Sequence, residues 1–363
     1  MDDRLDARLR RIPSSSFHDL IAQLCAIDAR KGWWQGQGLA GLMHLRRIPK
    51  RVVEISASAS LRIGGMHRPL TDGRARPPGA RGEASRADSA HVSGYAELLR
   101  VVYEGYREMR FGEDLIRHFH ARLLRYSSND HHHRGKYKTV SDTTQSYLRR
   151  KTDGPALRSA DPDVTPQAMA SATAWASTRL GSREFHPLLV IAGFVLELLA
   201  IRPFVNGNGR VSRMLTNLLL LQCGYAFLSY ASLERVIADR WAEYYIALRR
   251  SQANAHRPDP DISPWLHAFL EVIRIQADEV RALAEGRPDT TLLSKNQLAV
   301  LKLLEREGEI TNRLVCSELG MGRDTAKQVL HRLGALNYVR RAGAGRATRY
   351  RKAPAQDGGV GPR

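Results

Sequence analysis

One short segment carries most of the chemistry that this sequence could perform: Ile-Arg-Pro-Phe-Val-Asn-Gly-Asn-Gly-Arg-Val-Ser-Arg, residues 201–213. Gly207 and Gly209 let the backbone approach a ligand closely and adopt positive φ. Arg210 and Arg213 are three residues apart, so they share a face of the helix expected to follow. The unpaired N–H groups at the start of that helix, together with two guanidinium groups, indicate a polyphosphate site. The alternative is a helix–loop–helix turn in which Asn and Gly serve only as cap residues.

The same segment resembles the signature of the Fic (fido) family, His-x-Phe-x-Asp/Glu-Gly-Asn-Gly-Arg-x-x-Arg. The residues that match it are Phe204, Gly207, Asn208, Gly209, Arg210 and Arg213. The likeness covers residues 93–285, because the stretch after His186 resembles the family's helix before the motif and Met214–Leu221 resembles the helix after it. Membership implies a mainly helical core with a small β-hairpin flap.

The resemblance also implies a reaction and a role for individual residues. Family members typically transfer AMP from ATP to a hydroxyl side chain of a target protein. The Gly-Asn-Gly loop binds the phosphates, the two arginines hold the polyphosphate tail, and Tyr244 or Tyr245 is a candidate for contact with the adenine. The flap docks the backbone of the target as an added strand. The corresponding residues here are Lys136, Tyr137, Lys138 and Thr139.

Two positions of the signature depart from the family pattern. Arg202 stands at the catalytic histidine, and Asn206 stands at the acidic residue that holds magnesium. An imidazole with a pKa of about 6.5 accepts a proton at neutral pH, whereas a guanidinium stays protonated. A neutral amide oxygen is a poorer ligand for Mg²⁺ than a carboxylate. We therefore expect ATP to bind with Mg²⁺ weak or absent, and transfer to be slowed about 10²–10⁴-fold by the lost base alone.

A third departure concerns regulation. Many family members carry an inhibitory helix, Ser/Thr-x-x-x-Glu-Gly/Asn, whose Glu pairs with the second arginine of the motif. Residues 60–65, Ser-Leu-Arg-Ile-Gly-Gly, resemble it: Ser60 and Gly65 match, but Gly64 stands at the Glu position. We therefore expect Arg213 to lack its inhibitory partner and to remain free for phosphate.

The charge of the chain points to a second class of partner. Lys and Arg number 56 against 37 Asp and Glu, a formal net charge of +19 with a pI near 10.3. Such an excess attracts the phosphates of nucleotides or nucleic acids, although the Arg-rich proteome of a high-GC genome would by itself produce a similar bias. The segment 287–363 alone contains 15 basic and 7 acidic residues, a net charge of +8.

The end of the chain is typical of a winged helix-turn-helix. Helices are expected over 294–307, 311–319 and 323–334, followed by a hairpin that turns at Ala342–Gly345. The candidate DNA-binding residues are Arg323, Lys327, Arg332, Arg346 and Arg349. The alternative is a module for protein contact or dimerisation.

Hydrophobic periodicity and turn residues divide a mainly α chain into five parts. They are a helical region with the degenerate inhibitory helix at 1–66, a flexible linker at 67–91, a Fic-like domain at 92–286, the winged helix at 287–352 and a disordered tail at 353–363. The long helices expected in the Fic-like domain cover 93–109, 112–126, 165–180, 187–201, 208–223, 232–254 and 262–285. A strand-like flap lies within 127–163, and we interpret His131–His133 as a polar loop at its entry rather than a metal site.

Other classes of protein are disfavoured. The sequence lacks the run of about 20 apolar residues that a membrane helix needs. Its N-terminus is charged and its three cysteines are scattered, so a cytoplasmic protein without a disulfide framework is expected.

Two hypotheses of function remain. The first is a nucleotide-binding Fic-family protein, a protein adenylyltransferase by family whose site is impaired. The second is a DNA-binding transcriptional regulator in which the Fic core is a nucleotide sensor or a scaffold. Transfer of label from ATP to protein supports the first, and sequence-selective DNA binding without transfer supports the second. The partners expected are a nucleotide, a target protein and, through the winged helix, DNA, with a homodimer as an alternative assembly.

Overall fold

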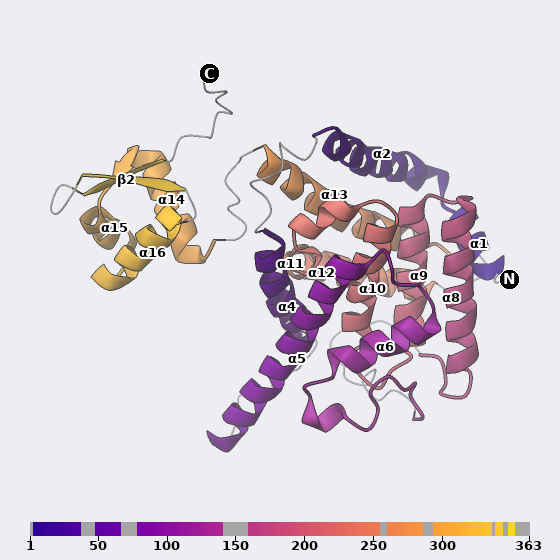
Figure 1. Ribbon diagram of the computed structural model, residues 1–363. Coiled ribbons are helices and arrows are strands. Elements are labelled where there is room, and N and C mark those ends of the chain that lie inside the picture. Colours follow the sequence, from indigo (N-terminus) through magenta and orange to yellow (C-terminus); the bar gives the residue numbers. More distant parts are fainter. Residues whose placement is uncertain are drawn as a thin grey trace. The chain divides into compact units, whose positions relative to one another are not determined.

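The computed structural model describes residues 3–37, 48–66, 78–140, 159–254, 260–285, 293–335, 338–343 and 348–352. Its elements are helices apart from one small sheet, so the predicted mainly α class is confirmed (Figure 1). The chain divides into two compact units, Met1–Val280 and Arg281–Arg363. Among the residues described, no helix has both the length and the apolar character needed to cross a membrane.

Two buried helices form the centre of the first unit, α9 (Pro187–Ile201) and α10 (Asn208–Gln222). Side chains on every face of α9 are buried, as expected for a helix that is apolar all round. Its buried carboxylate, Glu197, is paired with Arg4 and Arg8 of α1 (Asp3–Arg10). The chemistry-bearing segment of the sequence is therefore the connection between two core helices.

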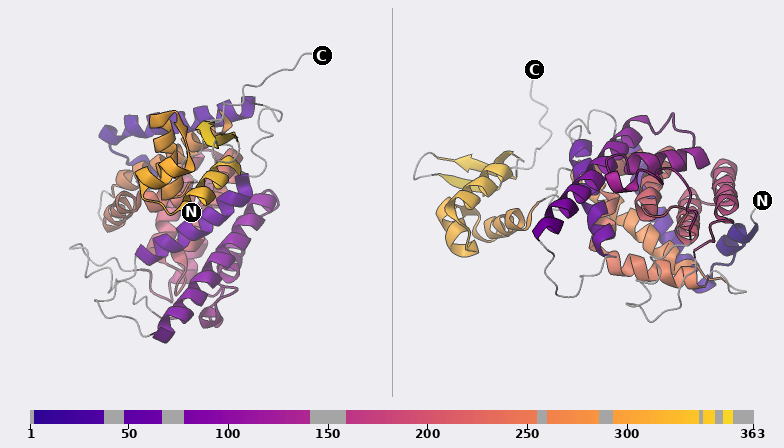
Figure 2. Two further views of the ribbon diagram at one scale, coloured as in Figure 1. Left: turned by 90° about the vertical axis from the view of Figure 1, so that its left-hand side faces the viewer. Right: turned by 90° about the horizontal axis from the view of Figure 1, so that it is seen from below.

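The other elements of the first unit share one apolar core with this pair. They are α2 (Ser14–Gly36), α4 (Ile48–Met66), α5 (Pro78–Gly105), α6 (Glu113–Leu123), α8 (Thr165–Ser182), η3 (Ala226–Tyr230), α11 (Leu233–Asp239), α12 (Trp241–Ala253) and α13 (Ser263–Ala284). A short 3-10 helix, η2 (Ser128–Asp130), follows α6 along the chain. Helices α4 and α5 lie side by side, and α5 also packs on α6 and α10 (Figures 1 and 2). This arrangement brings α4, α5 and α6 to the segment between α9 and α10.

The prediction of a flexible linker at 67–91 is wrong from Pro78 onward, because helix α5 begins at that residue. Proline suits the first turn of a helix, and the Ala, Arg and Glu residues that follow are good helix formers. Residues 67–77 lie outside the described residues.

The flap also differs from the expectation. Residues 131–140 form turns, bends and irregular chain, and the described parts of 127–163 contain no strand; residues 141–158 lie outside the description. The helix expected at 232–254 is divided into α11 and α12 by a break at Arg240.

The second unit combines helices with a small antiparallel sheet. Its described elements are α14 (Lys295–Glu307), β1 (Glu309–Ile310), α15 (Asn312–Leu319), α16 (Arg323–Ala335), β2 (Val339–Ala342) and β3 (Arg349–Lys352). The strand order is β1-β3-β2. Ser294 and Thr311 cap α14 and α15, and Gly320 turns the chain between α15 and α16 with a φ of +61°. The elements follow the predicted order, and the assignment as a winged helix stays a prediction.

Candidate functional site

The loop between α9 and α10 contains two residues in the left-handed region. Arg202 follows α9 with a φ of +50°, and Gly207 precedes α10 with a φ of +75°. Glycine adopts this conformation without steric cost, whereas it is uncommon for other residues. The sharp turn at Gly207 directs the first N–H groups of α10 toward the loop, where they are available to an anion.

Asn208 stabilises the loop with its side chain. Its Nδ2 donates to the Phe204 carbonyl oxygen at 2.7 Å, and its Oδ1 accepts from the Phe204 N–H at 2.9 Å. The ring of Phe204 is buried and stacks on His120 of α6, with centroids 3.8 Å apart. The amide of Asn208 is therefore used within the protein, and it is the backbone of this residue that can face a ligand.

The second motif arginine, Arg213, is held by α4. It is buried, and its Nη2 donates to Ser60 Oγ at 2.7 Å and to the Ser60 carbonyl oxygen at 3.2 Å. The expectation that Arg213 remains free is therefore wrong: the serine of the inhibitory-helix pattern contacts it without the glutamate. Its Nη1 lies 3.3 Å from the position that a Cβ on Gly209, in the first turn of α10, would take.

Gly64 lies one helical turn after Ser60, and apart from its chain neighbours and the backbone of its own helix no described atom lies within 4 Å of the position a Cβ would take. The sequence predicts that the loop binds ATP, and on that prediction Gly64→Glu should weaken the binding by about tenfold, because a carboxylate beside Arg213 would offset a positive charge that the phosphates would contact. Gly64→Gln is the matched control, since it adds the same bulk and helix propensity without charge. Calorimetric titration of both variants measures the difference; equal affinities would show that residue 64 does not reach the site.

The first motif arginine, Arg210, contacts α5. Its Nη1 lies 2.6 Å from His91 Nδ1, and its Nη2 is 3.6 Å from the position that a Cβ on Gly207 would occupy. Burial, together with the charge of Arg213, lowers the pKa of Arg210 to about 10. Arg210 is thus cationic at neutral pH and lies against the loop.

Asn206 is paired with an acidic residue that the motif does not contain. Its Nδ2 donates to Asp130 Oδ1 at 2.7 Å, while its own Oδ1 is buried without a hydrogen-bond partner. Burial raises the pKa of Asp130, but the hydrogen bonds from Ser127 and Asn206 lower it, so that the pKa lies below its usual range. A carboxylate is therefore present beside position 206, but it belongs to η2.

These side chains fit a divalent cation poorly. Asp130 Oδ1 accepts from Asn206 and from His133 Nε2, at 3.1 Å, and Asp130 Oδ2 accepts from Ser127 Oγ at 2.5 Å. Within the described part of the chain, no three His, Cys, Asp or Glu residues are grouped to hold a metal.

The two candidate adenine contacts lie in different surroundings. Tyr244 is buried and packs edge-on against Trp265, with centroids 4.9 Å apart, so it belongs to the core. Tyr245 is half-buried and stacks on Trp241 at 5.2 Å. Burial raises the pKa of Tyr245, and the nearby positive charges of Arg249 and Arg202 reduce this rise. Of the two tyrosines, Tyr245 is thus the one near Arg202.

Two of the four flap residues support the loop. The Lys138 N–H donates to the Pro203 carbonyl oxygen at 2.8 Å, and its buried Nζ donates to the Ile201 carbonyl oxygen at 2.9 Å. Tyr137 packs against Phe204 with centroids 5.6 Å apart. Lys136 and Thr139 are exposed, so they are the flap residues that a target could meet.

Sequence reasoning missed the histidines and the carboxylate beneath the loop. His120 accepts from the Gly135 N–H at 2.9 Å and donates to the Asn206 carbonyl oxygen at 3.3 Å. Burial, with the charge of His133, lowers the pKa of His120 to about 3, so it stays neutral. His133 belongs to the triple-histidine run, which was the signal that could have indicated this cluster.

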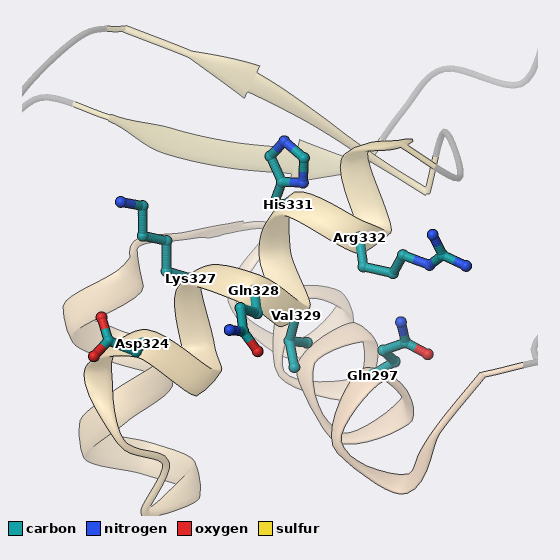
Figure 3. A pocket seen from close by; sticks show the side chains of 7 residues that line it. All are labelled: Gln297, Asp324, Lys327, Gln328, Val329, His331 and Arg332. Atoms are coloured by element: carbon teal, nitrogen blue, oxygen red, sulfur yellow. The ribbon is translucent and has the colours of Figure 1, made fainter.

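The second unit presents a polar face on α16. Arg323, Lys327 and Arg332 are exposed there, and Arg346 lies outside the described residues. A cavity on this face is lined in part by Gln328 and His331, two residues that the sequence did not indicate as DNA-binding candidates. Its lining residues are Gln297, Asp324, Lys327, Gln328, Val329, His331 and Arg332. In Figure 3, Lys327 and Arg332 extend to opposite sides of α16, with Gln328 and Val329 between them.

A basic row, Arg340, Arg349 and Arg351, lies across strands β2 and β3 of the small sheet. Arg349 and Arg351 of β3 both pair with Glu309 of β1, with Arg349 Nη1 2.9 Å from a Glu309 oxygen. Arg340 of β2 lies directly opposite Arg351. Like charges in register repel each other, and one carboxylate balances only part of this row.

Comparison with known proteins agrees with this architecture. Residues 110–220 match the model of the Fic/DOC family, so the chain contains a Fic/DOC domain that includes the loop and both motif arginines. A Fic family protein from Desulfovibrio desulfuricans G20 is similar over 97% of this chain and 98% of its own, with 20% identity and a TM-score of 0.53.

Two further solved structures are similar over a smaller part of the chain. A Fic domain containing signaling protein from Bacteroides thetaiotaomicron VPI-5482 matches 73% of this chain and 99% of its own, with 16% identity and a TM-score of 0.55. Fic-1 (residues 134–508) from C. elegans matches 73% of each chain, with 16% identity and a TM-score of 0.53. At these identities the likeness shows the fold.

Proposed function

We propose that the loop between α9 and α10 binds the polyphosphate of a nucleotide, with ATP as the first candidate, and that AMP transfer to a protein is absent or greatly slowed. The observation that carries the proposal is the placement of the two motif arginines. Each arginine has one guanidinium nitrogen beside a glycine at the start of α10: Arg210 lies 3.6 Å from the Cβ position of Gly207, the residue before the helix, and Arg213 lies 3.3 Å from that of Gly209, in its first turn. Two cations and the start of a helix on one loop favour a bound polyanion.

We expect AMP transfer to be slow because of the residues at positions 202 and 206, Arg202 and Asn206. A guanidinium does not accept the proton of a target hydroxyl at neutral pH. The amide of Asn206 is hydrogen-bonded to Asp130, so the carboxylate near the phosphates is engaged by protein donors. Fic domains elsewhere act on proteins, and the exposed Lys136 and Thr139 are where a target would dock.

ATP should bind to the full chain, and Arg210→Ala should weaken binding by about 10- to 100-fold, since a hydrogen bond to a charged group contributes roughly 1.5–3 kcal/mol. Calorimetry with and without Mg²⁺ measures both affinities. Arg110→Ala is the control, because it removes an exposed arginine outside the loop. No ATP binding at millimolar concentration, or equal losses in the two variants, would remove the nucleotide proposal.

A second candidate function, DNA binding, is favoured by the second unit. The turn at Gly320 presents α16 with an exposed polar face, and the basic row across the sheet lacks a balancing number of acids. An exposed helix that carries Lys327 and Gln328 has the donors and acceptors that major-groove base edges require. We treat this function as independent of nucleotide binding.

A further inference from the structure

The contact between Arg210 and His91 constrains the protonation of the histidine. A guanidinium can only donate hydrogen bonds, so at 2.6 Å the Nδ1 of His91 must accept, and it carries no proton. In neutral His91 the proton is then on Nε2, which lies 4.0 Å from Asp130 Oδ2. In this tautomer, the nitrogen without a proton contacts Arg210 of α10, and the protonated nitrogen is the one nearer to Asp130 of η2.

Charged and titratable groups surround this histidine on both sides. Arg210 faces it from α10, and Arg210 in turn lies near Arg213 and Tyr95. Asp130 faces it from η2, and His133 donates to the same carboxylate at 3.1 Å. Asp130 is ionised at neutral pH because Ser127 and Asn206 stabilise its charged form.

We propose that His91 is a positioning residue for Arg210: the neutral imidazole holds the guanidinium, and the protonated imidazole releases it, so that the loop binds nucleotide phosphates more tightly as the pH falls from about 8 to about 6. This inference rests on the proposed nucleotide site. It adds a pH-dependent control that the Fic motif itself does not contain.

The direction of the effect follows from the two states. Protonation of Nδ1 places two donors and two positive charges against each other, so Arg210 must turn away from His91. The imidazolium is then attracted to Asp130 and offsets its negative charge. A freed guanidinium and an offset carboxylate both favour a polyanion on the loop. By linkage, nucleotide binding takes up a proton, and a one-unit rise in the pKa of His91 corresponds to about tenfold tighter binding.

Titration of the full chain with metal-free ATP at pH 6, 7 and 8 measures this effect. The parent should bind about three- to tenfold more tightly at pH 6 than at pH 8 beyond any change shared by all variants. His91→Gln, whose amide oxygen accepts from Arg210 without titrating, should remain at the weaker affinity. His91→Ala should bind tightly throughout. His18→Gln, which replaces an exposed histidine of α2, should keep the profile of the parent.

Two outcomes overturn the inference and are distinguishable from failure of nucleotide binding. If ATP binds but His91→Gln has the pH profile of the parent, His91 does not control Arg210 while the nucleotide site stands. If no ATP binds, NMR titration of His91 in the ATP-free protein still decides the contact. Arg210→Gln should raise the pKa of His91 by about one unit, because it removes the facing cation. An unchanged His91 titration in Arg210→Gln also refutes the inference.

Discussion

Replacing Arg202 by histidine should raise AMP transfer by about 10²–10⁴-fold over a parent rate at or near background, because it restores a general base at the start of the loop. The backbone accepts this change: residue 202 has a φ of +50°, a region where histidine is found more often than most non-glycine residues. Transfer of labelled AMP from ATP to the chain itself or to proteins of a cell lysate measures the rate.

Arg202→Gln is the matched control for this experiment. It removes the guanidinium without adding a base, so it separates the gain of a proton acceptor from the loss of a positive charge. We expect Arg202→Gln to stay near background. Equal rates in Arg202→Gln and Arg202→His, or a parent as fast as Arg202→His, would mean that another group accepts the proton.

The contact between Asn206 and Asp130 changes how the acidic position must be restored. Asn206→Asp alone would set two carboxylates about 2.7 Å apart, and two like charges at that distance do not both ionise readily. Exchanging the pair, with Asn206→Asp and Asp130→Asn, keeps one amide and one carboxylate in the same hydrogen bond. In the Arg202→His background, the exchanged pair should therefore transfer faster than Asn206→Asp alone.

The sequence was informative where local rules decide the structure. The helix predicted at 187–201 is α9 residue for residue, because its ends are marked by Pro187 at the start and by the loop that follows Ile201. Glycine at 207 correctly indicated a left-handed residue before α10. The motif and its flanking apolar helices were thus sufficient to place the loop.

Partners far apart in the sequence were not predictable in the same way. Arg213 meets Ser60, Arg210 meets His91 and Asn206 meets Asp130 only after α4, α5 and η2 pack around α10. No spacing rule joins such residues, because each contact depends on tertiary packing. The linker was misjudged for a related reason: its Pro, Gly and Arg composition suggested a loop, yet from Pro78 the chain continues as one helix into a segment that packs on the core.

Binding of duplex DNA by the full chain should fall steeply with salt if α16 and the small sheet form a nucleic-acid surface. Each phosphate neutralised contributes about −0.9 to the slope of log affinity against log salt, so four contacts would weaken binding about 150-fold between 50 and 200 mM salt. Mobility-shift titrations across that range, on random and on selected duplexes, measure the slope. ATP is omitted so that nucleotide binding cannot contribute.

Substitutions on the sheet should then change the overall affinity for DNA, whereas substitutions on α16 should change the preference among DNA sequences. Arg340→Ala combined with Arg349→Ala, on β2 and β3, should weaken binding to all sequences alike and flatten the slope, because these side chains are expected to meet phosphates. Gln328→Ala, on the exposed face of α16, should instead reduce the preference for a selected duplex by about 1–3 kcal/mol per base pair read. Arg306→Ala is the matched control, since Arg306 on α14 is already paired with Glu307 and Glu318. If the parent gives no shift at low salt and micromolar protein, the second unit is a protein-contact module, and its basic row reflects composition alone.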